Sequence, residues 1–106
     1  MRSAFTPTKG VFYVRVQHFR VSKRDEADKA AEFLRSSGVP CEVIEIAREP
    51  VLIATDPFHL GLKPKDPQLT QEKARVEALK KRIKDLGREY NIKAGYSFDR
   101  CYESQW

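Results

Sequence analysis

Apolar and polar residues alternate along residues 11–19, which read VFYVRVQHF. Such alternation is typical of a strand with one buried face. Tyr13, Arg15 and Gln17 fall on one face, which is expected to meet solvent or a partner. The more apolar opposite face is expected to meet the core, and it carries Phe12, Val14, Val16 and His18. Residues 1–10 precede this strand and are predicted to form an extended tail.

The next pattern is helical and is followed by two more strands. The apolar positions Ala27, Ala30, Ala31 and Leu34 recur at the spacing of one helix face, and Gly38 and Pro40 end the helix. Residues 41–46, CEVIEI, are predicted to form a second strand. Residues 48–50 suit a tight turn. Residues 51–55, VLIAT, are almost continuously apolar, which is typical of a buried central strand.

A long loop, a second helix and a fourth strand complete the pattern. Residues 56–67 are rich in Pro, Gly and Lys, and such a loop either carries function or is an insertion. Asp66 and Pro67 suit the start of a helix that Gly95 ends, although Thr70 could equally start it. Residues 97–102, SFDRCY, are predicted to form the fourth strand. The apolar face of the helix is formed by Val76, Leu79, Ile83, Leu86 and Tyr90.

The element order β-α-β-β-α-β predicts an α+β fold of the ferredoxin-like split βαβ type over residues 11–106. Its four-stranded antiparallel sheet has both helices on one face, and right-handed connections give the strand order 4-1-3-2. Cys41 and Cys101 then lie on opposite edges, ~14 Å apart. Because a disulfide needs Cα atoms within about 7 Å, no internal disulfide is expected.

The sheet face away from the helices is the predicted binding site. Aromatic rings suit sugar rings or bases, and Arg and Gln supply directional hydrogen bonds. The alternatives are that the N-terminal tail or a second copy covers this face, and that a one-residue slip puts Asp99 and Cys101 on it instead. The predicted site residues are Tyr13, Arg15, Gln17, Leu52, Ala54, Phe98, Arg100 and Tyr102.

The composition narrows the class of function. His18 and His59 have no Cys or carboxylate at metal-ligand spacing, and no phosphate loop or nucleophile motif occurs. We therefore expect a binding module and not an enzyme, with no metal or cofactor. No apolar stretch is long enough for a membrane span. The net charge of +5 favours acidic partners, although the basic run at residues 80–84 also suits an ordinary solvated helix face.

Short motifs in the chain resemble those of the SPOR (sporulation-related repeat) domain. Residues 13–19, YVRVQHF, resemble its first strand, Y-V-Q-V-G-S-F. The helix with Ala30, Leu34 and Gly38 and the segment from Val51 to Phe58 follow in the family's order. The chain departs from the family in three places: Arg15 replaces a Gln, Gln17 and His18 replace Gly-Ser, and Asp56 replaces a Gly.

The resemblance implies a bacterial domain that binds peptidoglycan on the open sheet face and prefers glycan strands stripped of stem peptides. It also implies an envelope or periplasmic location if a signal or anchor lies upstream. Two alternatives stay open. One is a protein-protein or self-association module, such as a homodimer. The other is a basic nucleic-acid-binding domain, which is less favoured because VLIAT lacks the aromatic residues that RNA-binding modules of this fold carry there.

Overall fold

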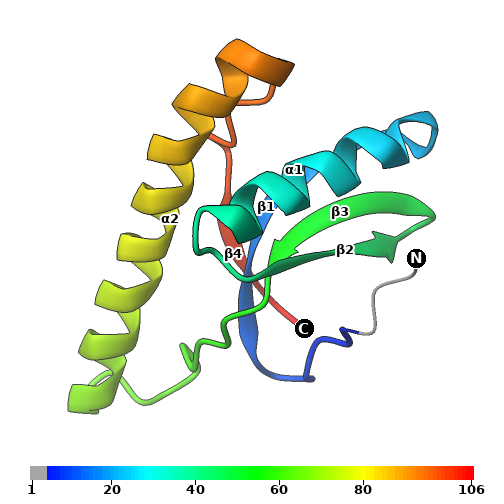
Figure 1. Ribbon diagram of the computed structural model, residues 1–106. Helices are drawn as coiled ribbons and strands as arrows, with labels where there is room; N and C mark the ends of the chain where they lie inside the picture. The colour runs from blue at the N-terminus through cyan, green and yellow to red at the C-terminus, as the bar shows by residue number, and fades with distance from the viewer. Residues whose placement is uncertain (1–4) are drawn as a thin grey trace.

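The computed structural model describes residues 5–106, and it confirms the predicted split βαβ fold (Figure 1). Four antiparallel strands form one sheet in the order β2-β3-β1-β4, which is the predicted order read from the other edge. Of the predicted tail, residues 1–4 lie outside the described part, and residues 5–10 form neither helix nor strand. The elements are β1 (Phe12–His18), a short 3₁₀ turn (Val21–Lys23), α1 (Arg24–Ser36), β2 (Cys41–Ile46), β3 (Glu49–Ala54), α2 (Pro67–Ala94) and β4 (Tyr102–Gln105).

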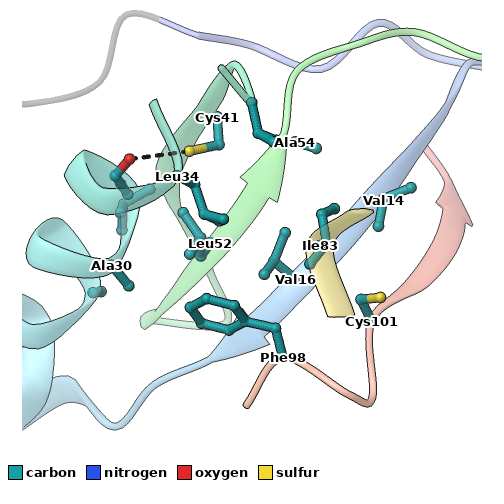
Figure 2. Packing of buried hydrophobic residues seen from close by; sticks show 14 of the residues in the cluster. Val14, Val16, Ala30, Leu34, Cys41, Leu52, Ala54, Ile83, Phe98 and Cys101 are labelled. Atoms are coloured by element: carbon teal, nitrogen blue, oxygen red, sulfur yellow. Dashed lines mark hydrogen bonds between the residues drawn. The ribbon is translucent and has the colours of Figure 1, made fainter. Parts of the chain in front are cut away.

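Both helices cover the same face of the sheet, which we call the inner face. The predicted alanine stripe of α1 is buried against it, because small side chains let this helix approach the strands closely. Side chains from α1, α2 and three of the strands meet in one core (Figure 2). Val14 and Val16 of β1 point into this core, as the alternation predicts.

The turn between β2 and β3 is tighter than predicted. The structure makes the turn with Ala47 and Arg48, where residues 48–50 were predicted to form it, and β3 begins already at Glu49. Both turn residues have positive φ angles, 52° and 69°. Two-residue hairpin turns of this kind normally use Asn and Gly, so the sequence lacks the usual signal for it.

The fourth strand lies later in the chain than predicted. Gly95 ends helix α2, as expected, and its φ of 81° makes it a left-handed cap. The chain then runs back past α2, and β4 begins only at Tyr102. Phe98, predicted within the strand, is instead fully buried and stacks on Tyr90 of α2 with ring centroids 5.3 Å apart. The strand prediction over residues 97–102 is therefore wrong except at its last residue.

Gly87 lets this returning segment cross α2 at close range. A Cβ at Gly87 would overlap the backbone carbonyl of Ser97 and lie 3.2 Å from the Cβ of Phe98. Glycine weakens a helix interior by about 1 kcal/mol relative to alanine. The close crossing explains why a glycine is present here despite that cost.

The loop before α2 is fastened at two points. Phe58 exchanges backbone hydrogen bonds with Phe12 at the start of β1, and both are 2.9 Å long. The buried Glu72 of α2 accepts a hydrogen bond from the His59 amide at 3.1 Å and pairs with Arg75. Burial alone would raise the pKa of Glu72, but these donors outweigh it and lower the pKa below its usual value.

Replacing Gly87 with alanine is expected to destabilise the protein although alanine is the better helix former. Overpacking a closed site costs about 1–3 kcal/mol, which exceeds the gain in helix propensity. Urea denaturation of Gly87→Ala measures the free energy of unfolding. Gly61→Ala is the matched control, because a Cβ there meets no atom within 4 Å. A Gly87→Ala variant as stable as the wild type would contradict the close crossing.

Replacing Glu72 with glutamine is expected to lower the free energy of unfolding by about 1–3 kcal/mol at neutral pH, since a charged hydrogen-bond acceptor is lost from a buried site. Because the folded-state pKa of Glu72 is lowered, its contribution is complete above the unfolded-state value of 4.5. It is lost as the pH falls through the lower folded-state pKa.

Denaturation curves of the wild type and Glu72→Gln should therefore converge in acid. Glu77→Gln serves as the control, because the side chain of Glu77 is 68% exposed on the same helix. A difference between the wild type and Glu72→Gln that stays constant from pH 7 to pH 3 would show that the carboxylate charge does not matter.

Candidate functional site: the outer face of the sheet

The sheet face opposite the helices, here called the outer face, carries Arg15 at its middle. Arg15 pairs across the sheet with Ile53 of β3 and with Tyr102 of β4. Directly paired residues of antiparallel strands lie on the same face. The alternation that placed Tyr13 and Arg15 opposite Val14 and Val16 is confirmed, since the two valines lie in the core.

The alternation does not continue to the end of β1. The register shifts between Arg15 and Gln17, so that Gln17 pairs with Leu52 and His18 pairs with Val51. Such a bulge adds one residue to a strand and changes which side chains share a face. His18, predicted to face the core, is exposed, and the Gln17 amide group bonds to the backbone of His18. Gln17 therefore pairs with a core residue of β3, and it does not take its predicted place beside Arg15 on the outer face.

Tyr13 is not available to a ligand, because the two ends of the chain cover it. Its ring lies between Phe5, at 5.4 Å, and Trp106, at 5.8 Å, both in edge-on contact. The amide of Thr8 donates to the Tyr13 hydroxyl at 2.9 Å. The expectation that Tyr13 lies open on this face is wrong, and the alternative in which the N-terminal tail covers part of the face is the arrangement observed.

Leu52 and Ala54 do not belong to the outer face. Both lie in the core beside Leu34 of α1 and Cys41 of β2 (Figure 2). The prediction that Leu52 and Ala54 belong to the site is therefore wrong. The residues of β3 on the outer face are Val51 and Ile53. All four of these β3 residues are fully buried. A strand buried on both faces carries no polar alternation, so its sequence does not show which residues face the helices.

Of the three residues predicted from the fourth strand, only Tyr102 reaches the outer face. Its side chain is 45% exposed and lies opposite Arg15. Phe98 lies in the core, and Arg100 is exposed in the turn before β4. The one-residue slip is also incorrect, because Asp99 lies in that same turn.

The Arg15 guanidinium is held by aromatic rings on the outer face. Its central carbon lies 4.8 Å from the centroid of Trp106 and 5.9 Å from that of Tyr102. A cation over an aromatic face is attracted by the ring, and the flat guanidinium stacks well on it. Trp106 was missed in the sequence because it follows the predicted strand. Trp106 lies four residues after Tyr102. In a strand that continued to Trp106, side chains four residues apart would share one face, and this spacing could have identified it.

A pocket of about 310 Å³ opens beside this cluster, at the β2 edge of the sheet. Residues 5–7, residues 43–46, Arg24 and Trp106 line it. Arg24 and Glu45 stand at the pocket as an ion pair 2.9 Å apart. Small-molecule sites commonly have volumes from about 300 Å³ upward and mix apolar walls with a few polar groups.

Peptide groups of β2 also face away from the other strands, because β2 is an edge strand of the sheet. The Thr55 amide donates to the Pro40 carbonyl at 3.0 Å, and this pair continues the ladder between β2 and β3. Bonded pairs alternate in an antiparallel ladder, so the backbone groups of Val43 and Glu45 point away from β3. Both residues line the pocket. Their amides and carbonyls are suited to hydrogen bonding with ligand hydroxyls or with a partner strand.

The basic run at residues 80–84 contributes to packing as well as to surface charge. Lys80 is largely buried and pairs with Glu103 of β4 at 2.8 Å. Hydrogen bonding to Glu103 raises the pKa of Lys80. Ile83 is in the core, and Arg82 donates to a backbone carbonyl just after α1. Because these residues make contacts within the protein, the run is less suited to form a nucleic-acid-binding surface on α2.

The two thiols are free and buried. Cys41 donates to the carbonyl of Ala31 at 3.3 Å (Figure 2). Burial raises the pKa of Cys41 to about 11, and it raises that of Cys101 as well. A thiolate is the nucleophilic form of cysteine, so these environments do not favour catalysis. Within residues 5–106, no group of three His, Cys, Asp or Glu side chains is arranged to hold a metal ion.

Comparisons with protein-family models, with curated proteins and with solved structures return no match. Among the described residues, no helix is both long enough and apolar enough to cross a membrane.

Removing the Tyr13 hydroxyl is expected to loosen the segment that covers the outer face. A typical hydrogen bond contributes about 0.5–1.5 kcal/mol, so the Thr8 amide should exchange with solvent roughly two to ten times faster in Tyr13→Phe. Hydrogen exchange followed by NMR measures this rate. Tyr96→Phe is the matched control, because it removes a hydroxyl bound to Glu26 elsewhere. Equal exchange rates of the Thr8 amide in the wild type and in Tyr13→Phe would contradict the hydrogen bond between Thr8 and Tyr13.

Proposed function

We propose that this chain is a non-catalytic module that binds the glycan strands of bacterial peptidoglycan on the outer face of its sheet. The observation that carries the proposal is the Arg15 guanidinium held between the rings of Tyr102 and Trp106, beside a pocket of about 310 Å³. The resemblance of residues 13–19 and 51–58 to SPOR motifs supports the same class of ligand.

Each part of this surface suits one feature of a sugar chain. The apolar face of a pyranose ring packs on a partly exposed aromatic ring, a position that Tyr102 offers. Arginine donates several hydrogen bonds in a fixed plane, which suits hydroxyl, amide and carboxylate oxygens. The outward peptide groups of Val43 and Glu45 add donors and acceptors at the far end of the surface.

The covering segment makes the surface smaller than a fully open sheet face, but also more rigid. Trp106 already packs on Tyr13, so the ring nearest Arg15 does not have to be ordered when a ligand binds. Binding to a preorganised surface saves the entropy cost of ordering side chains, about 0.5–1.5 kcal/mol for each flexible one.

The edge position of β2 favours a second candidate function, a protein-protein module in which a partner strand pairs with Val43 and Glu45. Light scattering distinguishes self-association from glycan binding. If the chain self-associates, its molar mass rises with protein concentration in the absence of glycan.

Cosedimentation with purified peptidoglycan sacculi tests the proposed function. The wild type is expected to sediment with sacculi, and more strongly after limited amidase treatment that removes part of the stem peptides and leaves the sacculi insoluble. Tyr102→Ala is expected to weaken binding about five- to tenfold, the equivalent of ~1–1.4 kcal/mol for the lost ring packing.

Ile92→Ala is the matched control for this experiment, because it also removes an exposed apolar side chain, 87% exposed, but from α2. Circular dichroism checks that both variants are folded. Wild-type protein that stays in the supernatant, or equal binding by wild type and Tyr102→Ala, would rule out this surface as the glycan site.

A further inference from the structure

Arg15 is a partly buried cation without a counter-ion in the described part of the chain. Its Nε atom is shielded from solvent and has no hydrogen-bond partner there. Four other arginines do pair with carboxylates; these are Arg24, Arg35, Arg75 and Arg88. Arg15 differs from them because its described neighbours are the two aromatic rings.

The acidic residues nearest to Arg15 in the sheet are held elsewhere. Glu103 follows Tyr102 directly, but strand alternation turns it to the inner face, where it pairs with Lys80 at 2.8 Å. Hydrogen bonding from Lys80 lowers the pKa of Glu103, so this acid stays charged and engaged on the other face. Glu42 of β2 is paired with Arg35 at 2.9 Å.

The geometry around Arg15 suits an anion that the ligand brings. A buried donor without a partner costs about 1–3 kcal/mol, and a ligand oxygen that accepts from it removes that cost. Arginine binds carboxylates through two parallel N–H···O bonds, which are stronger than bonds between neutral groups. The rings of Tyr102 and Trp106 hold the guanidinium in place before the ligand arrives.

We infer that Arg15 binds a carboxylate carried by a sugar, so that the module selects acidic over neutral glycans. This inference rests on the proposed function and adds the chemical group that the site recognises. In peptidoglycan that group is the lactyl carboxylate of N-acetylmuramic acid, which is a free anion only where the stem peptide has been removed. N-acetylglucosamine is the same sugar without the lactyl ether, so the two sugars isolate the contribution of the carboxylate.

Trp106 provides a direct reporter of this site. It is the single tryptophan of the chain, and its ring lies on the Arg15 guanidinium. Titrations of the full chain followed by tryptophan fluorescence compare N-acetylmuramic acid, its methyl ester and N-acetylglucosamine, with free lactate as a further arm. The wild type is expected to bind the acid at least about tenfold more tightly than the ester, N-acetylglucosamine or lactate. The preference should decrease as salt screens the charges.

Substitutions then test whether Arg15 is the residue responsible. Arg15→Gln is expected to remove the preference for the acidic sugar, and Arg15→Lys to retain a weakened one, because lysine keeps the charge but loses the two-point geometry. Arg100→Gln is the matched control, since it removes the same charge from an exposed turn and should leave the preference unchanged. The methyl ester tests the same contact without changing the protein, whatever the stability of the variants.

The outcomes separate this inference from the proposed function. If the protein sediments with amidase-treated sacculi but the acid, the ester and N-acetylglucosamine bind equally, the carboxylate inference is wrong and glycan binding stands. If the acidic sugar binds preferentially but the protein does not sediment with sacculi, the proposed function is wrong and the Arg15 site stands. A preference that survives in Arg15→Gln, or lactate binding as tight as that of the acidic sugar, overturns the inference.

Discussion

The alternation of side chains along β1 is the constraint on which the rest of the structure depends. Val14 and Val16 are buried between the sheet and both helices, and neither can leave the core without opening it. Arg15 lies between them in the sequence, so it must project from the outer face. Its charge is thus kept away from the core, and the rings of Tyr102 and Trp106 provide the partners that it finds on that face.

The two ends of the chain complete this face together. Trp106 exchanges backbone hydrogen bonds with Gly10 and Val11, so the end of β4 and the segment before β1 are joined. From this junction, Phe5 and Trp106 reach over Tyr13, while Trp106 also contacts Arg15. The candidate site is therefore built from parts that are far apart in the sequence, and it depends on the sheet pairing that brings them together.

The sequence predicts the fold well where a pattern has a single physical cause. The alanine stripe of α1, the caps of α2 at Asp66 and Gly95, and the outer position of Arg15 all follow from local periodicity or from backbone geometry. The bulge after Arg15 leaves no such pattern, which is why Gln17 and His18 were assigned incorrectly. The sequence also does not show which β3 residues face the helices, because the residues on both faces of this strand are apolar.

The largest difference between the predicted and the observed structure is the position of the fourth strand. Its cause is a tertiary contact that the local sequence does not show. Phe98 has a positive φ of 56°, which its own sequence does not favour, and burial against Tyr90 stabilises it. Its position depends on the close crossing that Gly87 allows, a contact between residues separated in the sequence by α2's last turns. Because this crossing shifts the strand to Tyr102–Gln105, it also determines that Trp106, and not Phe98, stands beside Arg15.

The most direct measurement of the central claim is a map of the ligand contact by two-dimensional NMR of the isotope-labelled chain with soluble peptidoglycan glycan strands. We expect changes in the amide signals of Arg15 and Tyr102 and in the indole signal of Trp106, while signals from the solvent side of α2 stay in place. Changes confined to α2, or unchanged spectra at a large excess of strands, would contradict a glycan site on the outer face.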